Sequence, residues 1–190
     1  MKLPSGLRAG FSLLEVTVST ATFAIIGYVM LVAVKTSTDA QNAIALRTEE
    51  HRVLRRASRT LLDELALASD DTITVTASGS GSGTASLAFR QRIEEGGTAG
   101  FGAVHLGVPH TDWTLVYAVS AAGELVRRVT DGDGVVQASA VVASGLRAAS
   151  EDPPGFRVVK AGDLWEITLA TEGVGDGNGI EEVFHVHARN

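Results

Sequence analysis

Acidic and amide side chains gather near a glycine-rich turn close to the end of the chain. They are Glu172, Asp176, Asn178, Glu181 and Glu182. Carboxylate and amide oxygens are ligands that Ca²⁺ prefers, so the cluster is a candidate calcium site. A turn between two strands explains the same residues without a metal, because glycine supplies the positive φ that such turns need. Asp131 and Asp133 form a smaller candidate of the same kind. We expect no cofactor, with calcium as the alternative.

Two histidines near the end of the chain have the spacing of a shared strand face. His185 and His187 are two residues apart, so a strand would place both on one face, where they could bind a metal. No third ligand is evident in the sequence, and an exposed edge strand explains the pair without a metal, so we expect no metal there. His105 and His110 are expected in a loop and suggest no chemistry.

A band of arginines is the strongest local concentration of positive charge in the sequence. Its members are Arg52, Arg55, Arg56 and Arg59. Like charges one helical turn apart do not stabilise an isolated helix. We expect these side chains to contact acidic faces of partner subunits, or DNA. A solvated helix face is the alternative.

The sequence lacks the common motifs of enzymatic sites. It contains no H-E-x-x-H, no G-x-S-x-G and no glycine loop followed by a phosphate-binding lysine. We therefore expect no catalysis. The absence of cysteine excludes disulfides and thiolate chemistry, and the excess of 22 acidic over 16 basic residues argues against a general nucleic-acid coat.

An apolar run near the start of the chain is long enough to cross a membrane. Glu15 is the only charged residue between Phe11 and Val34. A helix of that length is about 36 Å long, which exceeds a hydrocarbon core of roughly 30 Å. Lys2 and Arg8 precede the run without any acidic neighbour, so the positive-inside rule predicts a cytoplasmic amino terminus.

The helical pattern continues well beyond the apolar run. Proline is absent between Pro4 and Pro109, and glycine is absent between Gly27 and Gly79, which predicts one helix over residues 11–68. An apolar stripe in its second half is formed by Val53, Ala57, Leu61 and Leu65, with Leu46 and Leu54 alongside. This stripe predicts packing against a globular head.

Alternating strands follow the helix. The pattern predicts strands over residues 72–77, 85–91, 113–119, 124–129, 156–160, 164–171 and 181–188, separated by glycine and proline turns. Residues 78–86 and 94–102 are expected to be flexible loops. The predicted fold is α+β, with an antiparallel sheet packed on the carboxyl-terminal half of the long helix.

The residues Gly10-Phe11-Ser12-Leu13-Leu14-Glu15 follow the basic leader and open the apolar run. This arrangement resembles the type IV pilin and pseudopilin superfamily, whose motif is G-F-[ST]-L-[ILV]-E. The resemblance implies that a prepilin peptidase cleaves between Gly10 and Phe11 and methylates the new amino group of Phe11. It also implies the order of parts: a leader at 1–10, a transmembrane helix at 11–34, an amphipathic helix at 35–68 and a β-rich head at 72–190.

The resemblance gives Glu15 a role in assembly. Cleavage would leave a charged α-amino group on Phe11, and a carboxylate one turn along the helix could pair with the terminus of an adjacent subunit. The sequence departs from the family in two respects. The proline that many pilins have in this helix is absent, with Gly27 as the only weak point, and the disulfide of major pilins is absent.

The head is most similar to minor pseudopilin J of type II secretion and to the W-type minor pilins. The residues that carry this resemblance are Tyr117, Gly123, Leu125, Arg127 and Trp165. They match the order of a strand with Y-x-[LV], a G-x-L-x-R segment and a W-x-[IV] strand.

The resemblance implies a minor pilin or pseudopilin at or near the tip of a filament, which helps to initiate its assembly. Its partners would be other pilin subunits, the prepilin peptidase, the inner-membrane assembly platform and the lipid membrane. The head would be periplasmic or, in a pilus, at the cell surface. The alternative is a tip subunit whose head binds a surface ligand or DNA. A third hypothesis is a plain membrane-anchored receptor whose leader stays uncut. The sequence does not distinguish between a secretion system, a twitching pilus and a DNA-uptake filament as the machine that uses the subunit.

Overall fold

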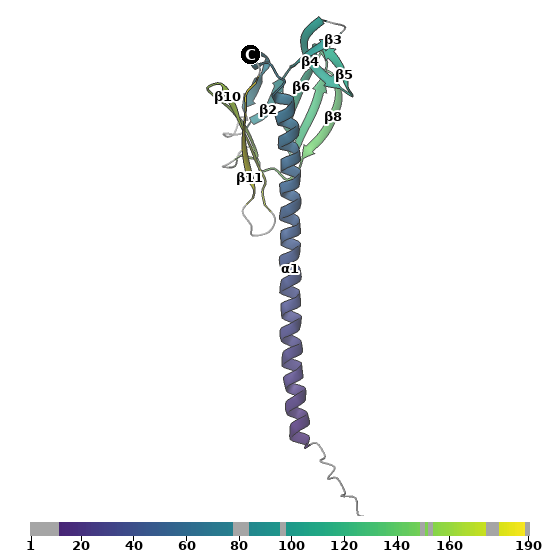
Figure 1. The fold of residues 1–190 in the computed structure, drawn as a ribbon, viewed down its shortest axis with the longest axis vertical. Coiled ribbons are helices and arrows are strands. Elements are labelled where there is room, and N and C mark those ends of the chain that lie inside the picture. The colour runs from purple at the N-terminus through teal and green to yellow at the C-terminus, as the bar shows by residue number, and fades with distance from the viewer. Residues whose placement is uncertain are drawn as a thin grey trace, which may run out of the picture. The chain divides into compact units, whose positions relative to one another are not determined.

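The computed structural model describes residues 12–77, 84–95, 98–148, 151, 154–173 and 179–188. These ranges contain a long helix, α1 (Leu13–Leu65), a short 3-10 helix, η1 (Asp70–Thr72), and eleven strands (Figure 1). The chain is therefore α+β, as predicted. It divides into two compact units between Ala45 and Leu46, which are described separately below.

The first unit consists, where it is described, of the apolar part of α1. Ser12 caps this helix, because its Oγ and its carbonyl oxygen both accept a hydrogen bond from the backbone N–H of Glu15, at 3.2 and 2.9 Å. Every side chain from Ser12 to Ala45 is exposed. The helix passes Gly27 without interruption, and by length and composition it can cross a membrane.

The second unit contains three antiparallel sheets. The first has five strands in the order β1 (Thr74–Ala77), β2 (Thr84–Phe89), β6 (Thr114–Val119), β7 (Leu125–Thr130) and β8 (Val136–Ala143). The second has the order β11 (Glu181–Val186), β10 (Leu164–Ala170) and β9 (Phe156–Ala161). The third has the order β3 (Gln91–Glu95), β4 (Thr98–His105) and β5 (Val108–Thr111).

The antiparallel head is as predicted, but its strands form three sheets where the sequence predicted one. The loop expected at 94–102 was also wrong in its described part, because β3 extends to Glu95 and β4 begins at Thr98. The glycines there reflect close packing between strands: a Cβ on Gly102 would lie 2.0 Å from the carbonyl oxygen of His110. His105 and His110 accordingly lie in β4 and β5 rather than in a loop.

The core of the second unit forms where the sheets meet the carboxyl-terminal part of α1. Figure 1 shows β10 and β11 to one side of this part of the helix and β6 and β8 to the other. The fully buried core side chains of the helix are Leu54, Ala57, Leu61 and Leu65. They pack with Phe89 and Tyr117 of the five-stranded sheet and with Phe156 and Ile167 of the second sheet. The predicted stripe is thus confirmed except at Leu46, which is 50% exposed.

Candidate interaction surface

The amino-terminal turn of α1 holds Glu15, the one acid in the apolar run. Glu15 lies in the first turn, where the helix dipole favours a negative charge. Among the residues that the structure describes, no side chain forms a hydrogen bond or ion pair with its carboxylate. The predicted cleavage residues Gly10 and Phe11 lie outside the described residues. The assembly role of Glu15 stays a prediction.

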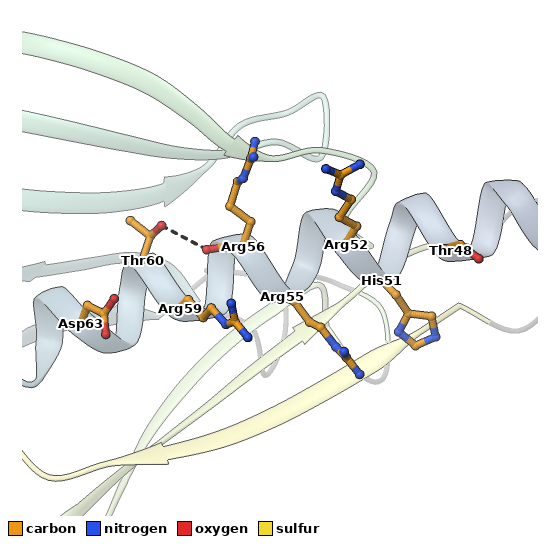
Figure 2. A pocket seen from close by; sticks show the side chains of 8 residues that line it. All are labelled: Thr48, His51, Arg52, Arg55, Arg56, Arg59, Thr60 and Asp63. Carbon is orange, nitrogen blue, oxygen red and sulfur yellow. Dashed lines mark hydrogen bonds between the residues drawn. The ribbon is translucent and has the colours of Figure 1, made fainter.

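The arginine band forms an open groove on α1 within the second unit. The groove has a volume of about 650 Å³ and is lined by Thr48, His51, Arg52, Arg55, Arg56, Arg59, Thr60 and Asp63. Figure 2 shows Arg52 and Arg56 projecting to one side of the helix and Arg55 and Arg59 to the other. Residues four apart share a helix face, so the sequence spacing itself produces these two pairs.

The four guanidinium groups have few partners within the described ranges. Arg55 Nε lies 3.8 Å from Glu182 Oε1, and Arg52 Nη1 lies 3.9 Å from Glu49 Oε2. Both arginine side chains are more than 70% exposed, at 72% and 75%. Exposed ion pairs at such distances contribute less than about 1 kcal/mol each. The arginines are therefore free to contact a larger anionic partner.

A second hollow adjoins the groove on the side of β8. It is lined by Glu49, Arg52, Val53, Arg56 and Val142, and its volume is about 280 Å³. Val142 belongs to β8, the edge strand of the five-stranded sheet. The arginines Arg52 and Arg56 thus lie next to a sheet edge as well as on the helix.

A half-buried ionic cluster, not singled out from the sequence, joins α1 to the five-stranded sheet. Arg127 donates to Glu64 through Nη2 at 2.7 Å and Nε at 2.9 Å, and the Tyr117 hydroxyl donates to Glu64 Oε2 at 2.5 Å. The Arg127 and Glu64 side chains are only 20% and 19% exposed. Burial, followed by the negative charge of Glu64, raises the pKa of Tyr117. The sequence signal was the position of Glu64, which falls on the apolar stripe between Leu61 and Leu65.

A second polar contact joins η1 to the β9–β10 sheet. Trp165 Nε1 donates to Asp70 Oδ1 at 2.8 Å, and Lys160 forms an ion pair with the same carboxylate. The hydrogen bonds from Lys160 and then Trp165 lower the pKa of Asp70. The Lys160 ammonium also lies 5.4 Å from the centre of the Trp165 ring, within range of a cation–π interaction.

The five residues that carry the resemblance of the head all contribute to its folding, through hydrogen bonds, burial or close backbone packing. Tyr117 and Arg127 meet on Glu64, and Trp165 binds Asp70. Leu125 is fully buried, and Gly123 adopts φ +69° at a point where a Cβ would lie 2.6 Å from the Leu146 carbonyl oxygen. These residues build the head.

The structure describes only part of the candidate calcium cluster, so the calcium site stays a prediction. Asp176 and Asn178 lie outside the described residues. Glu182 accepts a hydrogen bond from Ser58 Oγ at 2.9 Å and faces Arg55, so its carboxylate serves to hold β11 on α1, while Glu181 opens β11 as an exposed residue. Over the described ranges, no three His, Asp or Glu side chains are placed to hold a metal ion.

The smaller acidic turn has a local structural role. Asp131 Oδ1 accepts hydrogen bonds from the backbone N–H groups of Val135 and Asp133 at 2.9 and 3.0 Å. Gln137 donates to its other oxygen at 2.7 Å. These bonds, the one from Val135 first, lower the pKa of Asp131. Its oxygens are thus engaged in closing the turn between β7 and β8.

The histidines have separate partners. His185 Nε2 lies 3.5 Å from Glu166 Oε2, whereas His187 Nδ1 lies 3.2 Å from the carbonyl oxygen of Asp163. His110 stacks on Trp113 with ring centroids 3.8 Å apart. A shared metal between His185 and His187 therefore has no support in these contacts.

Comparison of the chain with protein-family models, with curated proteins and with solved structures found no match.

Proposed function

We propose that the chain is a minor pilin or pseudopilin, a structural subunit at or near the tip of a type IV pilus or type II secretion pseudopilus. The proposal rests mainly on the apolar half of α1. Its large side chains are exposed throughout, with Leu13 at 85%, Phe23 at 76% and Leu31 at 67%. Such a surface has to be covered in a stable state, first by lipid and then, in a filament, by the helices of other subunits.

The first turn of this helix supports the same proposal. The apolar run begins at a capped turn that carries one carboxylate, Glu15, without a partner among the residues that the structure describes. This turn directly follows the predicted cleavage point between Gly10 and Phe11. A carboxylate in hydrocarbon is costly unless it is paired. In the proposed filament, the N-methylated amino group of Phe11 on a neighbouring subunit supplies the partner and sets the axial register between subunits.

Processing is tested by the intact mass of the chain purified from membranes with and without a prepilin peptidase. The proposal requires loss of residues 1–10 and gain of one methyl group on Phe11 when the peptidase is present. A chain that keeps its leader in the presence of the peptidase would instead support the plain membrane-anchored receptor.

Assembly is tested with Glu15→Ala and the isosteric Glu15→Gln, because both remove the charge and only one changes the size of the side chain. Both variants should fractionate with the membrane and should fail to cross-link into filaments. Normal assembly of both variants would contradict the proposed pairing.

A ligand-binding or DNA-binding tip subunit is the second candidate, and the exposed arginine groove is the observation that favours it. The net charge of −6 weighs against a long polyanion as its ligand. We therefore propose assembly as the main role and treat the groove as a contact site for partner proteins.

A further inference from the structure

We propose that the free edge of β8, together with Arg52 and Arg56, binds an extended acidic segment of a partner protein. The site lies wholly within the second unit. The inference goes beyond filament assembly, because it assigns a peptide-binding groove that is complete whether or not α1 is packed in a filament.

The edge of β8 has the properties of a strand acceptor. β8 is the last strand of the five-stranded sheet, and β7 is its one pairing partner among the described strands. Its residues include no charge and no proline, two of the devices that prevent edge pairing, although bulges, a third device, occur near both ends of its pairing with β7. Val136 and Val141 are 49% and 57% exposed. About half of the residues of an edge strand direct their N–H and C=O groups outward, where another strand can bind them.

The bulges of β8 define where such a segment would pair. The register with β7 shifts between Val129 and Thr130 and again between Leu125 and Val126. Between these shifts, residues 138–141 pair regularly with residues 126–129 of β7. Bulges interrupt a ladder and twist the strand. The free edge of β8 is therefore suited to pairing with a short segment rather than with a long added strand.

The adjacent arginines specify the charge of the segment. Val142, near the end of β8, shares a hollow with Arg52 and Arg56, whose side chains lie on the same side of α1. Helix residues four apart have Cβ atoms about 5–6 Å apart. Alternate residues on one face of an extended segment are about 7 Å apart, so carboxylates at alternate positions can reach both guanidinium groups. Guanidinium groups bind carboxylates through paired hydrogen bonds.

A peptide fits these features better than a nucleic acid does. Backbone pairing with β8 requires amide groups in the ligand, which a nucleic acid lacks. The positive surface beside β8 comprises two arginines with Glu49 among them, in a chain of net charge −6. Nucleic-acid binding depends on many phosphate contacts along an extended basic surface.

The test measures binding to the full chain in detergent by fluorescence anisotropy. The probe is a labelled peptide of four Thr-Glu repeats. Combined Arg52→Glu and Arg56→Glu substitutions should weaken its binding by at least about tenfold, corresponding to the loss of two carboxylate contacts. The matched control is Arg55→Glu with Arg59→Glu, which changes the same charge at the same spacing on the other side of α1. An equal loss in the control would overturn the proposal, since it would show a general charge effect.

The proposed backbone hydrogen bonds between the peptide and β8 are tested by modifying the peptide rather than the protein. Two further peptides carry N-methyl amides at the odd or at the even positions, with unchanged side chains. One of the two should lose binding, because only one set of amides faces β8. Equal binding of all three peptides would overturn the strand-pairing arrangement.

Two other occupants are distinguished in the same experiment. An oligothymidylate of the same charge should bind at least about tenfold more weakly than the peptide; equal binding with the same arginine dependence would make the site a nucleic-acid surface. Sedimentation of the unliganded chain should be the same with and without Arg52→Glu and Arg56→Glu. Self-association that these substitutions abolish would make a second copy the occupant and overturn the proposal.

Discussion

The two halves of α1 have opposite relations to the rest of the chain. From Ser12 to Ala45 no side chain is buried, and each threonine hydroxyl for which we observe a bond donates back to its own helix, as Thr20 does to the Val16 carbonyl oxygen at 2.8 Å. From Leu54 to Leu65 the helix contributes four fully buried apolar residues and the Glu64 cluster. The carboxyl-terminal half packs into the core of the head, whereas the apolar side chains of the amino-terminal half are exposed.

This difference shows that the apolar side chains of one helix can serve two kinds of stability. An apolar side chain stabilises the unit that buries it, by roughly 25 cal/mol per Å² removed from water. The apolar residues of the second unit stabilise the head itself. Those of the first unit are exposed over residues 12–45, and in the proposed function lipid and then other subunits would bury them. Substitutions of the same type in the two halves should therefore have very different effects.

The largest effect is expected in the buried half. Leu61→Ala should lower the free energy of unfolding of the head by about 3 kcal/mol, because Leu61 is fully buried and its removal leaves a cavity. Leu31→Ala, a matched change at a residue that is 67% exposed, should change it by less than about 0.5 kcal/mol. Urea unfolding followed by Trp fluorescence measures both. Comparable losses in the two variants would break the contrast between the halves.

The next effect concerns the ionic cluster that fixes α1 to the sheet. Glu64→Ala should cost about 2–3 kcal/mol, since it leaves Arg127 and Tyr117 largely buried without their shared acceptor. Glu49→Ala, at an exposed acid on the same helix, is the control and should cost little. The same unfolding assay applies. A Glu64→Ala head as stable as the Glu49→Ala head would mean that the cluster does not stabilise the fold.

A smaller and local effect is expected at the start of the exposed half. Ser12→Ala removes the side-chain acceptor of the Glu15 N–H and should destabilise the first turn by about 1 kcal/mol. Amide hydrogen exchange in detergent should accelerate for the first turn and stay unchanged in the head. Faster exchange in the head as well would show that the two units are coupled through this cap.

The smallest effect should appear in the pH dependence of the head. The pKa of Asp70 is lowered in the folded state, so this carboxylate stabilises the head above its ordinary pKa of 3.8 and loses that contribution as the pH falls below it. The side chain is 27% exposed, and its pair with Lys160 is worth less than about 1 kcal/mol. Asp70→Asn should reduce the drop in unfolding midpoint between neutral pH and acid. An unchanged acid profile would assign the drop to other carboxylates.

The sequence predicted those features that depend on local periodicity. The long helix, the stripe of Ala57, Leu61 and Leu65, and strands such as β6 and β10 follow from repeats of four and of two residues. The arginine groove also follows from local spacing, because residues four apart share a helix face.

Features that depend on distant pairing were missed. β8 is rich in alanine and valine without alternation, so its sequence gave no strand period, and β4 contains glycines that resemble a loop. The division into three sheets depends on which strands pair, and this is decided by contacts far apart in the chain. Glu64 lies on the predicted stripe, but its partners Tyr117 and Arg127 come from strands that only the fold brings to it.

The Glu64 cluster also has a mechanical consequence. In the proposed filament, a tensile load along α1 would pass into the head through the bonds that cross from helix to sheet. The apolar contacts of Leu61 and Leu65 resist separation but allow sliding, whereas Arg127 and Tyr117 hold the Glu64 carboxylate in a fixed direction. Under axial force, Glu64 is therefore the point at which we expect the helix to yield from the head.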